Sequence, residues 1–199
     1  CTGEAAHSGA VPRWLRRDAV LAAADLAMRL DGSWRTLLER GEDLVMTFGI
    51  FGTDPRAHAM TRVPGECRFS LEYRSESEAT LDAFGALVES EAGEVARERR
   101  VRFDLGPGVR TPPATMDPRL LRHAAAVCAR AGIPNEVLAS GAGHDAAIFA
   151  GAGVPTAMVF VRNEHGSHNP QEAMEFEAFL TAAGVLQALL LTGAEALRA

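Results

Sequence analysis

The sequence contains no lysine, and all 20 of its basic residues are arginines. Because 26 residues are acidic, the formal net charge is −6 when histidine is neutral. The arginines are scattered along the chain and do not form the basic stripe that a nucleic-acid interface requires. We therefore expect no nucleic-acid partner.

Cysteine and long hydrophobic runs are also scarce. The cysteines at positions 1, 67 and 128 form no CxxC pair, which indicates reduced thiols in a cytoplasmic protein. The longest apolar run near the end, residues 182–191, contains Gln187 and is shorter than the ~20 residues that a membrane-spanning helix needs. The first residues show neither the basic start nor the apolar block of a signal peptide. These features predict a cytoplasmic protein without a membrane partner.

What is present suits a globular fold, since hydrophobic residues fill 47% of the 199 positions and can build one large core or two small ones. Apolar residues three and four apart predict a helix over residues 13–31, ended by Gly32. Residues 44–50 and 67–74 alternate between apolar and polar, as strands with one buried face do.

Two further elements complete this half of the chain. Ser77 is expected to begin a second helix, and residues 101–105 to form another strand. The order of elements predicts a small α+β sandwich, an antiparallel sheet with two helices, over residues 1–110. Adjacent prolines at 112 and 113 favour an extended linker, so we place the domain boundary between about residues 106 and 116.

The pattern changes from about residue 117. The expected elements are a helix to Ala131, a loop over 139–143, a short helix, an apolar strand over 156–161 and a long helix from Gln171. This alternation predicts, for residues 111–199, the C-terminal portion of a mixed, mostly parallel α/β domain.

Two histidine segments could carry chemistry. His144 follows a glycine turn and precedes a short helix, so its imidazole and nearby N–H groups could meet one anion or carbonyl oxygen. The simpler interpretation is that Asp145 caps the helix and His144 is merely exposed.

The second segment, His165 to Glu172, follows the predicted strand 156–161 and so would lie at the carboxyl edge of the sheet, where open α/β folds place ligands. Imidazole suits zinc, but zinc takes about four ligands. No HxxxH, HxH or HExxH spacing supplies the others. The spacing alone therefore leaves metal binding open.

Four short motifs occur in order along the chain: GEAAHSGAVP with RDA, VPG with EYR, SGAGHDA, and GSHNP. This series resembles the C-terminal half of the hydantoinase/carbamoylase amidase family, which includes N-carbamoyl-L-amino-acid hydrolases and allantoate amidohydrolases. The family lies in the dinuclear zinc aminoacylase and carboxypeptidase clan. Its members have a further upstream half that carries an HxD motif, paired glutamates and another metal-binding histidine, none of which occurs in this sequence.

The resemblance implies roles for the histidines. His168 matches the last metal ligand of the family. His144 and Gly143 match the loop that binds the substrate near the scissile carbonyl, with Asp145 orienting that loop. His7 matches a histidine of the small domain that helps to stabilise the oxyanion.

The resemblance also implies how the substrate is held. Arg74 closes a strand motif, EYR in this sequence, whose arginine clamps the substrate carboxylate at two points. Many relatives have Asn thirteen residues earlier, where this chain has Thr61, with His58 a turn away. One hydroxyl replaces an amide that is both donor and acceptor, so the contact with the substrate must differ.

For the complete enzyme, the resemblance implies two zinc ions, with manganese, cobalt or nickel as substitutes. They activate a water that attacks a carbamoyl or linear amide carbon, releasing carbon dioxide, ammonia and an L-amino acid. The expected partners are a small molecule with a free carboxylate and a second copy bound through the small domain. Residues 1–199 alone are expected to be inactive, because one zinc ligand does not make a site.

Two other interpretations stay open. The first is a non-catalytic dimerising or ligand-binding module, in which the small domain pairs with itself and any ligand contact is vestigial. The second is an aminoacylase or metallopeptidase of the same clan that acts on a peptide bond.

Overall fold

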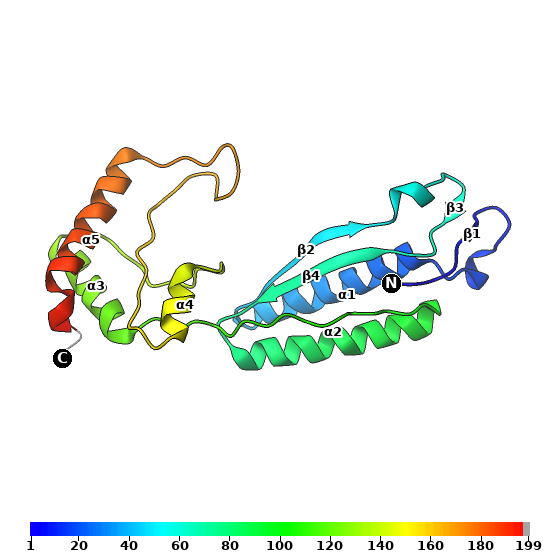
Figure 1. Cartoon of the computed structure of the whole chain (residues 1–199), viewed down its shortest axis with the longest axis horizontal. Helices are drawn as coiled ribbons and strands as arrows, with labels where there is room; N and C mark the ends of the chain where they lie inside the picture. Colours follow the sequence, from blue (N-terminus) through cyan, green and yellow to red (C-terminus); the bar gives the residue numbers. More distant parts are fainter. Residues whose placement is uncertain (197–199) are drawn as a thin grey trace. The chain divides into compact units, whose positions relative to one another are not determined.

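The computed structural model describes residues 1–196 and, in the last helix, side chains up to residue 193. The chain forms two compact units, Cys1–Pro113 and Ala114–Ala199. Figure 1 shows the elements of each unit.

The first unit is built on an antiparallel pair of strands, β2 (Val45–Gly52) and β4 (Arg68–Arg74). The pairing runs from Val45 opposite Arg74 to Gly52 opposite Arg68, with an irregularity between Thr47 and Ile50. Side chains of β4 alternate between half-buried and exposed, which confirms the predicted one-sided strand. Two shorter strands, β1 (Ala6–His7) and β3 (Arg62–Val63), pair with each other.

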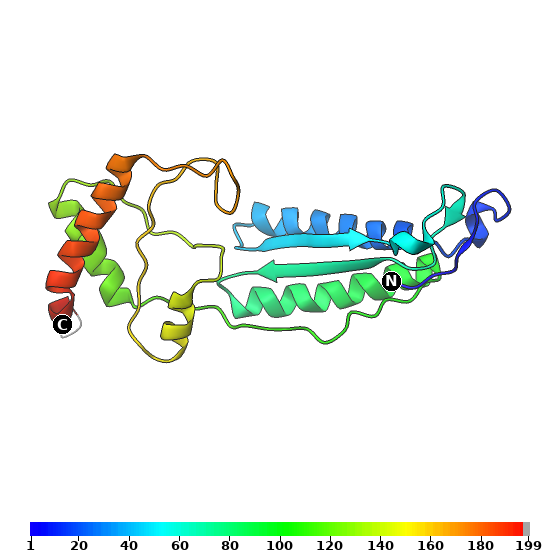
Figure 2. The same cartoon turned by 45° about the horizontal axis from the view of Figure 1, so that its top comes forward.

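Helices α1 (Ala19–Glu39) and α2 (Glu78–Arg99) lie along one face of the β2–β4 pair (Figures 1 and 2). The side chains of Asp18 and Ser77 cap them by accepting hydrogen bonds from N–H groups of the first turns. The core between helices and strands consists of Ala22, Leu26, Leu30, Leu44, Met46, Phe84, Val88, Ala92 and Val95. This arrangement is the predicted α+β sandwich.

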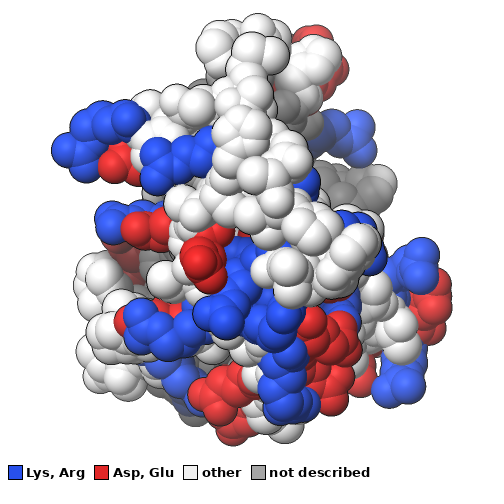
Figure 3. Space-filling model, turned by 90° about the vertical axis from the view of Figure 1, so that its right-hand side faces the viewer, with Lys and Arg blue, Asp and Glu red and all other residues white. Residues whose placement is uncertain are grey.

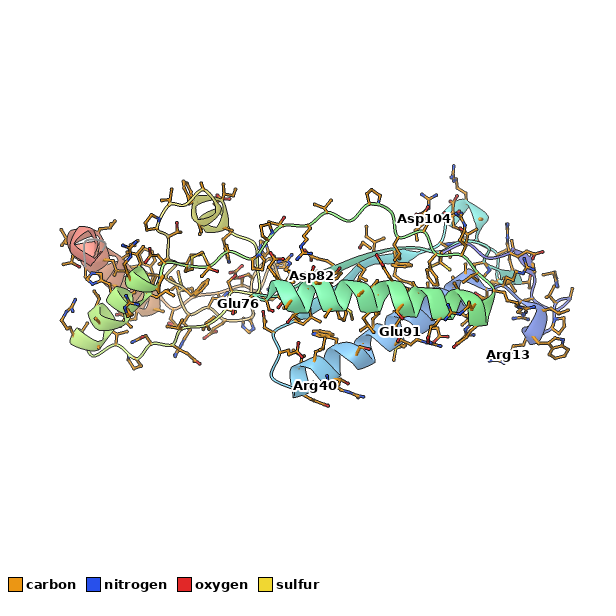
Figure 4. All side chains as sticks on the ribbon, turned by 90° about the horizontal axis from the view of Figure 1, so that it is seen from below. Arg13, Arg40, Glu76, Asp82, Glu91 and Asp104 are labelled. Carbon is orange, nitrogen blue, oxygen red and sulfur yellow. The ribbon has the colours of Figure 1, made fainter. Side chains whose placement is uncertain are left out.

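A charged cluster joins the two helices. The Arg29 guanidinium on α1 contacts Asp25 on its own helix and Glu91 and Glu98 on α2, while Arg99 on α2 bonds Asp25 in return. Glu91 lies on the side of α2 that faces α1 (Figure 4). One guanidinium thus holds carboxylates of both helices.

Two predicted boundaries in this unit were wrong. The helix predicted from residue 13 begins six residues later, at Ala19, and residues 13–15 form a separate 3-10 turn. Helix α1 also continues through Gly32, because Leu37 packs against the core and the Trp34 indole donates to the Leu44 carbonyl oxygen at 2.7 Å. A glycine costs a helix only about 1 kcal/mol, which such contacts exceed.

The predicted strand 101–105 is reduced to one bridge, in which Arg102 and Thr2 exchange two backbone hydrogen bonds. Its neighbour Phe103 still packs against the core. An extended segment with a single paired residue satisfies few of its backbone groups by pairing, so it does not extend the sheet.

The second unit contains helices α3 (Pro118–Arg130), α4 (Asp145–Gly151) and α5 (Phe176–Ala196). Helices α3 and α5 pack through Val127, Cys128 and Val185. The predicted strand 156–161 is not formed among the residues that the structure describes: within residues 114–196 the segment pairs with no other strand. A strand requires a neighbour to satisfy its N–H and C=O groups, and none of the described residues supplies one.

The apolar part of helix α5 is longer than the run of residues 182–191 considered from the sequence. Residues Phe176–Gly193 are long and apolar enough to cross a membrane by length and composition, because Glu177 is their one charged residue. This test alone is weak, since core helices of soluble proteins also pass it. Large apolar side chains are exposed along α4 and α5: Ile148, Phe149, Phe176, Phe179, Leu180, Leu186, Leu190 and Leu191.

Candidate functional site

His7 lies at the end of the first unit formed by β1 and β3. It pairs with Arg62, and the N–H of Ser8 donates to the carbonyl oxygen of Thr61 at 2.8 Å. The structure therefore brings His7 and Thr61, two of the predicted site residues, next to each other. Both residues are exposed.

Two glycines of the sequence motifs make this pairing sterically feasible. A Cβ on Gly65 would lie 2.7 Å from the Ala5 nitrogen, and one on Gly3 would lie 2.0 Å from the Arg17 carbonyl oxygen. The two glycines are themselves joined by a hydrogen bond from the Gly3 N–H to the Gly65 oxygen at 2.8 Å. Any larger residue would push apart the segments that carry His7.

The His7 ring is held by its own loop. The Gly9 N–H donates to His7 Nδ1 at 3.1 Å, so this nitrogen is an acceptor and the proton of the neutral ring lies on Nε2. The exposed ring therefore offers Nε2–H as a hydrogen-bond donor. A neutral donor of this kind suits an oxygen that gains negative charge during a reaction.

Arg16 fixes the same loop from the other side. Its Nε donates to the Val11 oxygen at 2.9 Å, and a terminal nitrogen donates to the Ser8 oxygen. Sequence reasoning passed over Arg16, although it directly precedes the Arg17 of the RDA motif. A half-buried arginine that bonds two loop carbonyls is a feature that only the fold reveals.

Strand β4 extends away from the β1–β3 end of the unit (Figure 1), and Arg74 is its last residue. Its Nε and a terminal nitrogen both donate to one Glu72 carboxylate oxygen, at 2.9 and 2.7 Å. Six steps along the strand from Arg68 to Arg74 span about 20 Å. Within one copy of this unit, a small molecule at His7 and Thr61 therefore does not reach Arg74.

The face at the β1–β3 end carries both signs of charge (Figure 3). Arg56 pairs with Asp54, and Arg68 with Glu66, and these acids raise the pKa of both guanidinium groups. Positive and negative side chains are thus interspersed on this face.

In the second unit, His144 precedes the first residue of α4, and Ser140 organises its loop. The His144 Nε2 lies 2.9 Å from Ser140 Oγ, which also accepts from the Ala142 N–H at 2.9 Å. Gly141 adopts φ +64°, a left-handed conformation that glycine tolerates. The loop is thus held by Ser140, while Asp145 lies in the first turn of α4.

His168 lies in a loop closed at its base by the backbone pair Glu164 and Ala173, with N–H to oxygen distances of 2.7 and 3.3 Å. The side chain of Glu172 reaches into this loop, and its hydrogen bonds to Ser167 and Asn163, together with one from the His168 N–H, lower the pKa of the carboxyl. His168 itself is exposed.

A metal site needs more than this chain shows. Over residues 1–196, no three or more His, Cys, Asp or Glu side chains come together in a way that could hold a metal ion. An exposed imidazole on a loop with a fixed backbone fits one ligand position.

Comparisons with known proteins agree with the motifs. The family model for peptidase family M20/M25/M40 matches residues 15–192. Allantoate amidohydrolase of Escherichia coli (strain K12) is 33% identical over 171 residues, covering 85% of this chain and 40% of that protein. N-carbamoyl-L-amino-acid amidohydrolase of Rhizobium meliloti is 30% identical over 195 residues, covering 98% of this chain and 45% of that protein.

A crystal structure of an amidase of the hydantoinase/carbamoylase family from Burkholderia multivorans has a similar fold, with a TM-score of 0.83 and 30% identity. The match covers 93% of this chain and 44% of that one. This chain therefore spans less than half the length of each of the three relatives. The chain belongs to peptidase family M20/M25/M40, and the two curated relatives named above are amidohydrolases.

Proposed function

We propose that this chain is the C-terminal part of a metal-dependent amidohydrolase that cleaves a carbamoyl or linear amide C–N bond of an N-carbamoyl-L-amino acid or ureido acid. The names of two relatives, allantoate and N-carbamoyl-L-amino-acid amidohydrolase, support the substrate class. Both substrates combine a carboxylate with a ureido group. "Complete protein" below means this chain together with the upstream half that its relatives possess.

The observation that carries the proposal is the His7 ring, whose Nδ1 accepts from Gly9 and whose Nε2–H is offered to solvent. A positioned neutral donor stabilises the oxyanion that forms when a carbonyl is attacked. His144 and Gly143 would contact the carbonyl end of the substrate, and Thr61, next to His7, would bond its polar groups.

His168 would supply one ligand to a centre of two divalent ions, zinc in the first instance. Such ions lower the pKa of a bound water and polarise the carbonyl. The other ligands would come from the upstream half, so residues 1–199 alone would bind metal poorly and be inactive.

The separation between His7 and Arg74 supports a homodimer formed through the small domain. Each end of β4 would then serve a different active site, and Arg74 would clamp the carboxylate of a substrate that a distinct copy of His7 contacts. A guanidinium binds a carboxylate at two points, and the bonds of Arg74 to Glu72 show that its nitrogens can converge on one carboxylate oxygen.

The exposed apolar surface of the second unit supports its place in a larger domain. We propose residues 1–110 as the dimerising lid and residues 111–199 as part of the α/β catalytic domain. Leu190 and Leu191 are each 78% exposed and Ile148 is 72% exposed. Burying such side chains contributes roughly 25 cal/mol per Å², so an upstream half that covers them would be bound firmly. It would also offer a neighbour to residues 156–161.

Ammonia release by the complete protein tests the function. N-carbamoyl amino acids and allantoate-type ureido acids should release ammonia, whereas N-acyl amino acids and dipeptides should be poor substrates. Cleavage of the peptides with no ammonia from the ureido acids would favour the peptidase interpretation instead. Inactivity toward all of them, in a protein that binds metal, would favour the non-catalytic module.

A further inference from the structure

The carboxylate of Glu172 is the centre of the hydrogen bonds in the His168 loop. One oxygen accepts from Ser167 Oγ at 3.1 Å and from Asn163 Nδ2 at 3.2 Å, and the other accepts from the backbone N–H of His168 at 3.1 Å. Asn163 also donates to Ser167 Oγ at 3.3 Å. The Glu172 side chain thus links Asn163 and Ser167, which precede the histidine, to the backbone of His168.

The loop needs such a tie because its backbone is unfavourable. His165 and His168 both adopt φ +63° and Gly166 adopts φ +70°. Residues other than glycine rarely occupy this left-handed region, and they stay there only when surrounding contacts fix them. The loop is exposed, so no apolar core supplies those contacts. Hydrogen bonds must do so.

Other bonds in the loop fix its outer part only. Asn169 Nδ2 donates to the His165 oxygen at 2.8 Å, and its Oδ1 accepts from the Gln171 N–H at 2.9 Å. Neither bond touches the backbone of His168. Among the side chains that the structure describes, Glu172 is the one that bonds the His168 N–H.

We propose that Glu172 is a positioning residue that sets the direction of the His168 imidazole toward the metal centre. The inference rests on the proposed function, in which His168 is a metal ligand. Glu172 would act through the peptide of His168 and would not bind metal itself.

The chain offers a matched control. Glu164 lies in the same loop and is also exposed, but it pairs with Ala173 through backbone atoms, which a side-chain substitution leaves in place. Glu172→Gln and Glu164→Gln therefore remove the same charge from the same loop. Only the first weakens the acceptor of the His168 N–H.

The test measures zinc affinity of the complete protein by competition with a chromophoric chelator, alongside its thermal midpoint. Glu172→Gln should weaken zinc binding roughly 10-fold or more with the midpoint unchanged, and Glu164→Gln should leave the affinity as in the wild type. Equal affinities for Glu172→Gln and wild type would overturn the proposal. So would equal losses in both variants, since charge alone would then explain them.

Two further variants keep the result interpretable. If Glu172→Gln fails to fold, Ser167→Ala removes one of the donors to Glu172, and it should weaken zinc binding in the same direction by a smaller factor; unchanged affinity would overturn the proposal. His168→Ala distinguishes a failure of the proposed function from a failure of the proposed role of Glu172. If it leaves zinc affinity intact, the proposed function loses its metal ligand; if it abolishes binding while Glu172→Gln does not weaken it, only the role of Glu172 fails.

Discussion

Alanine should have opposite effects on the stability of the first unit at two of its glycines, Gly65 and Gly32, because only Gly65 of the two is closely approached by other atoms. In Gly65→Ala, the new Cβ would lie 2.7 Å from the Ala5 nitrogen, and reaching an ordinary contact of 3.4 Å requires a backbone shift of about 0.7 Å. That shift would stretch the 2.8 Å bond from the Gly3 N–H to the Gly65 oxygen to the limit of a hydrogen bond. Losing the bond costs about 1 kcal/mol, and overpacking a further 1–3 kcal/mol.

Gly32→Ala is the contrasting case. Gly32 lies inside α1, and a Cβ there would meet nothing within 4 Å. Alanine should therefore stabilise the unit by about 0.5–1 kcal/mol, because it is the better helix former.

Urea denaturation followed by tryptophan fluorescence measures both effects, since the two tryptophans, Trp14 and Trp34, lie in this unit. The midpoint should fall for Gly65→Ala and rise for Gly32→Ala. An unchanged or higher midpoint for Gly65→Ala would refute the close packing of Ala5, just before β1, against the segment that follows β3. It would also remove the steric reason for glycine in that motif.

Three other substitutions test the proposed chemistry and the electrostatics. In the complete protein, His7→Ala should lower turnover by ~10²-fold or more if the ring stabilises an oxyanion, and unchanged turnover would remove it from the mechanism. Arg74→Lys should weaken carboxylate substrates far more than their amide analogues, because lysine lacks the two-point fork; equal losses would make Arg74 structural. The hydrogen bond from Arg119 lowers the pKa of Asp117 to about 2, so the ionised carboxylate stabilises the fold above pH ~4 and loses this effect as the pH falls through about 2. Unfolding midpoints between pH 4 and 2 should therefore fall more steeply for wild type than for Asp117→Asn, and parallel curves would contradict this assignment.

Local sequence patterns correctly predicted the elements that depend on residues close in the sequence. The period of two in residues 68–74 places Phe69, Leu71 and Tyr73 on the core face, as the structure shows. The cap at Ser77 marked the start of α2 correctly. The helix end predicted at Gly32 was wrong because contacts of later residues with the core outweigh one poor helix former. The strand predicted over residues 156–161 is not formed among the described residues because strand pairing depends on a neighbour distant in the sequence.

For the candidate site, the motifs indicated the histidines but not the residues that hold them. Ser140, Arg16 and Glu172 act on backbone N–H and C=O groups of loops, and such contacts leave no periodic signal in a sequence. The distance between His7 and Arg74, by contrast, follows from strand length once β4 is recognised.

In the proposed function, this chain supplies part of an amidohydrolase active site and the remaining metal ligands lie upstream. Metal analysis after dialysis, paired with ammonia release, tests it most directly when residues 1–199 and the complete protein are compared. We predict stoichiometric zinc and turnover for the complete protein, and neither for residues 1–199, because His168 alone cannot hold a divalent ion against water. Stoichiometric zinc with turnover from residues 1–199 would contradict this prediction, because these residues would then hold a complete site.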